Sequence, residues 1–231
     1  IMKRGKKYIK VSKDLDRTKS YSIQQGIKEA KKASYSKFVG SLEAHFDIII
    51  PKDRDPKSIK GAVSFPYSVS DKSVTVAAFV TPDKEKGAKE AGADFVGLDS
   101  LIKDIKEGKI SFDVAIATST VMPKIAVLGK ELGPKGLMPN PKNGTVTEDI
   151  VSAIKEYKKG KQTFACDSSG VIHMKIGRLD MDDQKLIENL HSAVSAIEEI
   201  LGKPYNQIIK RLHIVPTMGP SFKIDYKKEE E

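Results

Sequence analysis

The 231-residue sequence has little cysteine and no tryptophan, and its apolar runs are short. A single cysteine, Cys166, cannot form an internal disulfide, which excludes a small disulfide-stabilised scaffold. Cys166 has no cysteine partner and the four histidines are scattered, so the sequence offers no metal-ligand spacing. No stretch approaches the roughly 18 consecutive apolar residues of a membrane-spanning helix, and residues 3–10 lack the apolar run of a signal peptide. We therefore expect a cytoplasmic protein that binds no metal and no membrane.

Several enzyme motifs are missing as well. The sequence contains neither G-x-G-x-x-G nor G-x-x-x-x-G-K-[ST], the two loops that cradle nucleotide phosphates. It also lacks H-E-x-x-H and G-x-S-x-G, and no histidine has a neighbour that marks a nucleophile or general base. We predict no catalytic residue and no cofactor. An α/β enzyme that binds a small phosphorylated ligand between its domains is kept as the alternative.

The formal net charge of +9 is concentrated in the first part of the chain. Residues 1–66 contain 16 Lys and Arg against 7 Asp and Glu, residues 67–157 contain 12 against 13, and residues 158–231 contain 12 against 11. The excess is therefore +9, −1 and +1 in turn. A polyanion is attracted to the surface where cations gather. A generally basic protein whose charge only keeps it soluble is the other interpretation.

Both ends of the chain show the period of two that is typical of half-buried strands. Strands are predicted over residues 38–50, 61–65, 162–166, 171–176, 208–215 and 222–226, and helices over 22–34 and 182–201. Residues 162–166 and 171–176 are expected to pair as a hairpin across the turn at 167–170. The basic residues 3–10 are expected to be poorly ordered by themselves.

The middle of the chain has a different pattern. Strands at residues 74–80, 94–96 and 114–117 alternate with helices at 82–91, 98–107, 121–130 and 147–157. This alternation predicts parallel βαβ units with helices on both faces of a sheet. We therefore predict an α/β fold: a split α+β domain of residues 1–66 and 158–231, interrupted by an inserted Rossmann-like, three-layer α/β domain of residues 67–157.

Residues 132–147, LGPKGLMPNPKNGTVT, form a shaped loop. Their prolines and glycines exclude a helix or a central strand, because proline removes N–H donors and glycine permits positive φ. Two cations, Lys135 and Lys142, stand at the bends. From the residues alone, a surface connection between two helices is the simpler interpretation.

This loop resembles, nearly letter for letter, the signature of the L-one family of ribosomal proteins, which form the lateral stalk of the large subunit, and the resemblance extends over almost the whole chain. Three further stretches resemble the RNA-contacting segments of that family: SKF followed by Ser41, GVIHMKIGR, and TMGP. The family usually has Thr where Ser41 stands, which keeps the hydroxyl. The resemblance implies RNA-binding roles for Lys37, Phe38, Ser41, His173, Lys175, Thr217, Met218 and Gly219, and a secondary RNA or tRNA contact at Lys135 and Lys142.

The same resemblance implies a function. Such a protein is a structural constituent of the large subunit that binds 23S-type rRNA at a mobile stalk near the tRNA exit site. It assists the release of deacylated tRNA and represses translation of its own operon mRNA, and it is a monomer when free of the ribosome. The residue types agree, since RNA is read through hydroxyls, stacking side chains and close backbone approach as well as cations. Without the resemblance, TMGP is most simply a tight hairpin connection, and a protein-interaction module is a further alternative.

Overall fold

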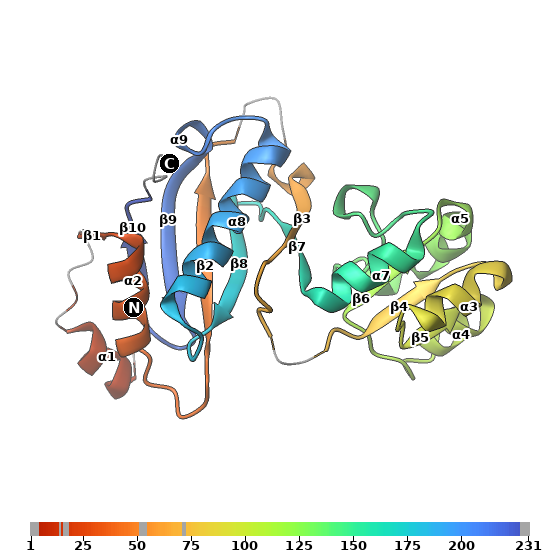
Figure 1. Ribbon diagram of the computed structural model, residues 1–231, viewed down its shortest axis with the longest axis horizontal. Coiled ribbons are helices and arrows are strands. Elements are labelled where there is room, and N and C mark those ends of the chain that lie inside the picture. The colour runs from red at the N-terminus through yellow and green to blue at the C-terminus, as the bar shows by residue number, and fades with distance from the viewer. Residues whose placement is uncertain (1–4, 14, 16–18, 51–54, 71–72, 227–231) are drawn as a thin grey trace. The chain divides into compact units, whose positions relative to one another are not determined.

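The computed structural model describes residues 5–13, 15, 19–50, 55–70 and 73–226. The chain divides into two compact units: unit 1 comprises Ile1–Ser70 and Phe164–Glu231, and unit 2 comprises Asp71–Thr163. The red and blue ends of the chain share unit 1, whereas the yellow and green middle forms unit 2 (Figure 1). The boundaries expected from the sequence, 66/67 and 157/158, lie a few residues before those of the structure, 70/71 and 163/164.

Unit 1 is built on a five-stranded sheet with the strand order β1-β10-β9-β2-β8. In that order the strands are Ser20–Tyr21, Phe222–Ile224, Ile209–Pro216, Ser41–Ile48 and Val171–Arg178. Strand β2 runs antiparallel to both of its neighbours, β8 and β9, while β1 runs parallel to β10. The sheet therefore combines β1 and β2 from the N-terminal part of the chain with β8, β9 and β10 from the C-terminal part.

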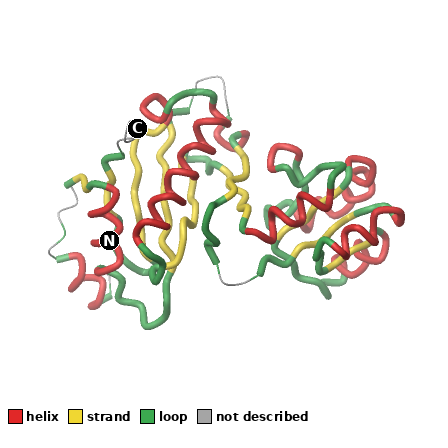
Figure 2. Tube along the Cα trace, viewed as in Figure 1, coloured by secondary structure: helices red, strands yellow, loops and turns green. Residues whose placement is uncertain are grey.

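Helices α2 (Ile23–Lys32) and α8 (Asp183–Leu201) cover one face of this sheet (Figure 2). On β2 the residues facing them are buried in the core of unit 1: Leu42, Ala44, Phe46 and Ile48. The alternate residues are partly exposed on the opposite face: Ser41, Glu43, His45 and Asp47. We call this opposite side the open face; it also carries the cross-strand partners of these residues on β8 and β9. The period of two predicted for this stretch is confirmed, with a shorter strand.

The ends of the two covering helices follow local sequence signals. The hydroxyl of Ser22 accepts a hydrogen bond from the backbone N–H of Gln25 at 3.4 Å, so Ser22 is the N-cap of α2. Helix α8 ends at Gly202, whose φ of 67° is the left-handed conformation that favours glycine. Helix α8 buries a stripe of apolar residues against the sheet, including Leu186, Leu190, Val194 and Ile197.

The predicted hairpin in the C-terminal part of the chain is wrong. Strand β7 (Lys161–Ala165) pairs with β3 (Lys60–Ser64) in a separate two-stranded sheet, and β8 pairs with β2. Residues 162–166 and 171–176 are joined by a single isolated antiparallel bridge, between Cys166 and Ile172. The backbone N–H of Cys166 donates instead to Ile59 O at 2.9 Å.

The basic stretch near the N-terminus also differs from expectation. Residues Lys6–Ser12 form a helix, α1, while residues 3 and 4 lie outside the described part of the chain. Val11 of this helix packs against the core of unit 1. This apolar contact stabilises the helix, which the charge pattern alone does not predict. The remaining short elements of unit 1 are η1 (Pro56–Ser58) and α9 (Tyr205–Ile208).

Unit 2 has three layers around a parallel sheet with the order β5-β4-β6. The strands are Phe95–Gly97, Val76–Phe79 and Val114–Ala117. On one face the core includes residues of α3 (Pro82–Glu90) and α7 (Ile150–Lys159). On the other face it includes α4 (Asp99–Lys106) and the short helices that follow β6. The chain therefore has the α/β fold predicted from its sequence.

The helix expected at residues 121–130 is divided into short pieces. These are η2 (Ser119–Val121), α5 (Met122–Ile125), η3 (Ala126–Leu128) and α6 (Gly129–Leu132). Their apolar residues still bury against the sheet: Val121, Ile125, Leu128 and Leu132. The segment is therefore helical, as predicted, but it alternates between 3-10 and α-helical turns.

Candidate nucleic-acid interface

The start of β2 is joined to the turn after β9 by three hydrogen bonds between Ser41 and Thr217. The backbone N–H of Thr217 donates to Ser41 O at 2.9 Å, and the backbone N–H of Ser41 donates to Thr217 Oγ1 at 2.8 Å. The Thr217 hydroxyl donates in turn to Ser41 O at 3.1 Å. The Thr217 hydroxyl, which the resemblance assigns to RNA binding, therefore also links β2 to the turn after β9.

The turn that contains Thr217 has a constrained backbone. Gly219 N–H donates to Pro216 O at 2.9 Å, and Met218 has φ of 67°, the one non-glycine residue with positive φ in the part of the chain that the structure describes. A Cβ added to Gly219 would lie 2.5 Å from Pro216 Cγ, so only glycine fits there. Packing of the turn, and not only close approach of a ligand, explains this glycine.

Two large apolar side chains are exposed beside this junction. Met218 is 62% exposed and Phe38 is 61% exposed, although a folded protein tends to bury such groups. Lys37 precedes Phe38 and is also exposed. We name the set of Lys37, Phe38, Ser41, Thr217, Met218 and Gly219 the Ser41–Thr217 end.

The other two residues expected to bind RNA lie further along the open face, on β8. Lys175 is the cross-strand partner of Glu43, and His173 is the partner of His45. The imidazole rings of His45 and His173 meet edge to face with centroids 4.5 Å apart. A register shift between Leu42 and Glu43 marks a bulge at this point of the β2–β8 ladder. Both predicted residues on β8 therefore adjoin polar residues of β2.

The charges on this part of the open face offset one another. Hydrogen bonding from His45 lowers the pKa of the Glu43 carboxyl; nearby His173 and Lys175 act in the same direction, against the effect of burial. His45 Nε2 lies 3.3 Å from Glu43 Oε2. Partial burial lowers the pKa of Lys175, while Glu43 opposes that change. The Glu43 carboxylate thus lies among Lys175 and the imidazoles of His45 and His173.

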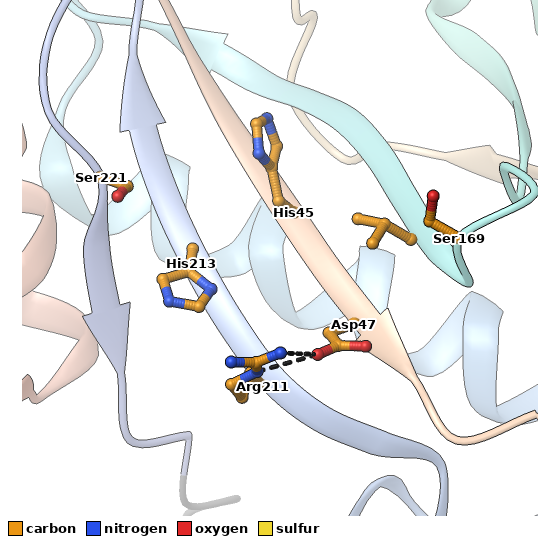
Figure 3. Close-up of a pocket in the computed structure, with 7 residues that line it drawn as sticks. His45, Asp47, Ser169, Arg211, His213 and Ser221 are labelled. Carbon is orange, nitrogen blue, oxygen red and sulfur yellow. Dashed lines mark hydrogen bonds and ion pairs between the residues drawn. The ribbon is translucent and has the colours of Figure 1, made fainter. Parts of the chain in front are cut away.

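Sequence reasoning missed a third group of residues on the same face. His213 of β9 is the cross-strand partner of His45, and Arg211 is the partner of Asp47. Arg211 donates from Nε and Nη2 to Asp47 Oδ2 at 2.8 and 2.7 Å, as Figure 3 shows. The alternation of β2 indicated that His45 and Asp47 point away from the core. Nothing in the local sequence indicated which strand would lie beside them.

The predicted secondary contact lies in unit 2, on the loop at residues 132–147. Thr145 ties this loop together by accepting from Asn140 N–H at 2.7 Å and donating to Asn140 O at 3.0 Å. The Tyr157 hydroxyl of α7 donates to Asn143 O at 2.7 Å, and the short turn η4 (Pro141–Asn143) ends at Gly144 with φ of 67°. Lys135 and Lys142 are both exposed on this shaped loop. They belong to a different unit from the Ser41–Thr217 end.

A comparison with protein families identifies the class of this protein. Residues 27–220 match the model of the ribosomal protein L1p/L10e family. This match covers well over half of the chain and includes parts of both units. The chain belongs to this family of ribosomal proteins.

Individual relatives agree with this assignment over nearly their whole length. The chain is 42% identical to the large ribosomal subunit protein uL1 of Kosmotoga olearia over 229 residues, which is 98% of each chain. It is 41% identical to the protein of that name from Thermosipho africanus over 227 residues, covering 96% of this chain and 97% of the relative. It is 40% identical to the one from Maridesulfovibrio salexigens over 226 residues, covering 96% and 95%.

These comparisons decide one of the alternatives that the sequence left open. The family is one of ribosomal proteins and not of enzymes, so the enzyme alternative is excluded. As a ribosomal protein of bacterial type, the chain has its place on the ribosome in the cytoplasm. Among the described residues no cluster of histidine, cysteine and carboxylate side chains could hold a metal ion, and no helix there is long and apolar enough to span a membrane.

Proposed function

We propose that this chain is a structural constituent of the large ribosomal subunit and that unit 1 is its RNA-binding domain, with unit 2 as the inserted domain. Unit 1 would bind large-subunit rRNA of the 23S type through the Ser41–Thr217 end and the adjoining open face. The relatives are each named as proteins of the large subunit, which supports the first part. The observation that carries the second part is the hydrogen-bonded Ser41–Thr217 junction with Phe38 and Met218 exposed beside it.

The chemistry of this surface suits folded RNA. RNA is recognised by shape, by contacts to 2′-hydroxyls and by bases that stack on side chains. The Ser41–Thr217 end offers an exposed aromatic ring, an apolar wedge and a cation on a backbone that is already held in place. A pre-organised surface loses little conformational entropy on binding, so more of the contact energy appears as affinity. The excess of cations in residues 1–66 adds a salt-sensitive attraction to phosphates.

Further roles belong to the same proposal. The protein would form part of a mobile stalk near the tRNA exit site and assist the release of deacylated tRNA, with Lys135 and Lys142 as the contact to RNA or tRNA. Their exposure on a well-tied loop supports this role. When free of the ribosome, as a monomer, the protein would bind its own operon mRNA through the Ser41–Thr217 end and repress translation.

A salt titration tests the central proposal. The full chain is titrated with a large-subunit rRNA fragment that carries the stalk junction, and with an RNA of equal length in which the junction is scrambled. We expect the native fragment to bind on the order of a thousandfold more tightly, with both affinities falling as salt rises. If the two RNAs bind alike and both are lost at moderate salt, net charge explains all of the binding and the proposal fails.

A further inference from the structure

A hollow of about 500 Å³ lies on the open face of unit 1, further along β2 than the Ser41–Thr217 end. Side chains from β2, from β9 and from the segments that precede β8 and β10 surround it: His45, Asp47, Ser169, Arg211, His213 and Ser221 (Figure 3). Val171 adds an apolar wall. We propose that this hollow holds one unpaired nucleobase of the RNA that the Ser41–Thr217 end binds. This inference rests on the proposed function and adds a base-reading subsite to it.

Two imidazole rings make the floor of the hollow suitable for stacking. His45 and His213 are direct cross-strand partners on the open face, and neighbouring side chains of such a pair lie about 4.5–5.5 Å apart at Cβ. The His45 ring also meets the His173 ring in an edge-to-face arrangement. His213 is partly exposed, as a ring that stacks on a base must be.

The charge state of His213 also favours a neutral ligand. Partial burial lowers the pKa of the His213 imidazole, and electrostatic interactions with Arg211, His45 and Lys223 lower it further, while Asp47 acts in the opposite direction. The ring is therefore neutral at pH 7 and keeps one donor and one acceptor nitrogen. These neighbours come from β9, β2 and β10, the strands that surround the ring.

The balance of polar groups in the hollow fits a base better than a phosphate. The guanidinium of Arg211 is engaged by the Asp47 carboxylate, so its charge is largely offset, and a phosphate would meet that carboxylate. Ser169 and Ser221 line the hollow, and a serine hydroxyl can both donate and accept a hydrogen bond. The edge of a nucleobase carries donors and acceptors without net charge, which matches such a lining.

Continuity with the proposed interface supports RNA as the occupant. His45 contacts His173, one of the residues assigned to RNA by resemblance. Ser41 and His45 are four positions apart along β2, which is about 13 Å at roughly 3.3 Å per residue of strand. One RNA molecule seated at the Ser41–Thr217 end can therefore place a nearby unpaired nucleotide over the hollow.

Abasic scanning tests the proposal. Each unpaired nucleotide of the rRNA fragment that carries the stalk junction is replaced in turn by an abasic nucleotide, and the affinity of the full chain is measured for every RNA. At one position we expect the native protein to lose about tenfold in affinity, as for loss of one stacked base. The variant His213→Ala should bind the intact RNA about tenfold more weakly and show less than a twofold further loss at that position. His213→Phe, which keeps a stacking ring, should retain the dependence on the base.

Two outcomes overturn the proposal. If no abasic position distinguishes the native protein from His213→Ala, no base occupies the hollow. If abasic RNAs bind normally and Arg211→Gln lowers the salt slope by about one, the hollow binds a phosphate. Should His213→Ala fail to fold by circular dichroism, His213→Gln serves in its place. Failure of the proposed function is recognised separately, because the intact fragment would then bind no more tightly than the scrambled RNA.

Discussion

Thr217 is the residue in which folding and binding are most closely linked. Its hydroxyl accepts from Ser41 N–H and donates to Ser41 O, so Thr217→Val leaves a partly buried backbone donor without its partner. We expect this variant to lose about 1–3 kcal/mol in the free energy of unfolding, measured by urea denaturation, and to bind the rRNA fragment more weakly.

The matched control for that change is Thr217→Ser. It keeps the hydroxyl and should restore most of the stability and most of the RNA affinity. If Thr217→Val unfolds at the same urea concentration as the native protein, the Ser41–Thr217 hydrogen bonds contribute nothing to the fold. A variant that is as stable as the control but binds RNA weakly would assign the hydroxyl to RNA alone.

A change at Met218 is expected to move stability and RNA affinity in opposite directions. A left-handed conformation costs a residue with a side chain roughly 1–2 kcal/mol, part of which Met218→Gly would recover. We therefore expect Met218→Gly to raise the free energy of unfolding by up to about 1 kcal/mol while lowering affinity for the rRNA fragment, because the exposed wedge is lost. Denaturation and binding measured on the same preparation check both signs, and unchanged affinity would remove Met218 from the interface.

At the scale of elements, the loop at residues 132–147 depends on α7. Tyr157 is buried and its hydroxyl donates to Asn143 O; burial also raises its pKa far above the ordinary value. Tyr157→Phe should lower the free energy of unfolding by about 0.5–1.5 kcal/mol and increase amide hydrogen exchange in the loop. Lys155→Ala, on the exposed side of the same helix, is the control. Equal exchange in both variants would show that the loop is held by other contacts.

Strands and helices that depend on local sequence patterns were predicted well, whereas the pairing between strands was not. The apolar alternation of β2 and the caps of α2 and α8 depend on residues within a few positions of one another. The predicted hairpin of residues 162–166 and 171–176 was wrong because strand pairing depends on distant parts of the chain. Its turn does form, since the Asp167 carboxylate accepts from Ser169 N–H and Val171 N–H at 2.8 Å each. Strand β3, however, takes the place of β8 beside β7.

At the scale of the whole molecule, the main RNA contact and the secondary RNA or tRNA contact predicted from the sequence belong to different units. Lys37 lies in unit 1, and Lys135 and Lys142 lie in unit 2. The double variant Lys135→Ala/Lys142→Ala should bind the rRNA fragment within about twofold of the native protein and bind deacylated tRNA several-fold more weakly, since each phosphate contact adds a similar increment. Lys37→Ala should show the reverse. Fluorescence anisotropy with both RNAs checks this, and equal losses in all four measurements would mean that the charges act only collectively.

The amino-acid pattern was sufficient for the fold class, for most elements and for the family, because apolar spacing, capping residues and motifs such as TMGP are properties of adjacent residues. It was not sufficient for the arrangement of the open face. Ser41 and Thr217 are 176 residues apart in the chain, yet three hydrogen bonds join them. His45 acquires His173 on one side and His213 on the other only when β2 enters the sheet between β8 and β9. Such pairings depend on the burial of one whole sheet face under α2 and α8, which is a property of the folded unit and of no single segment.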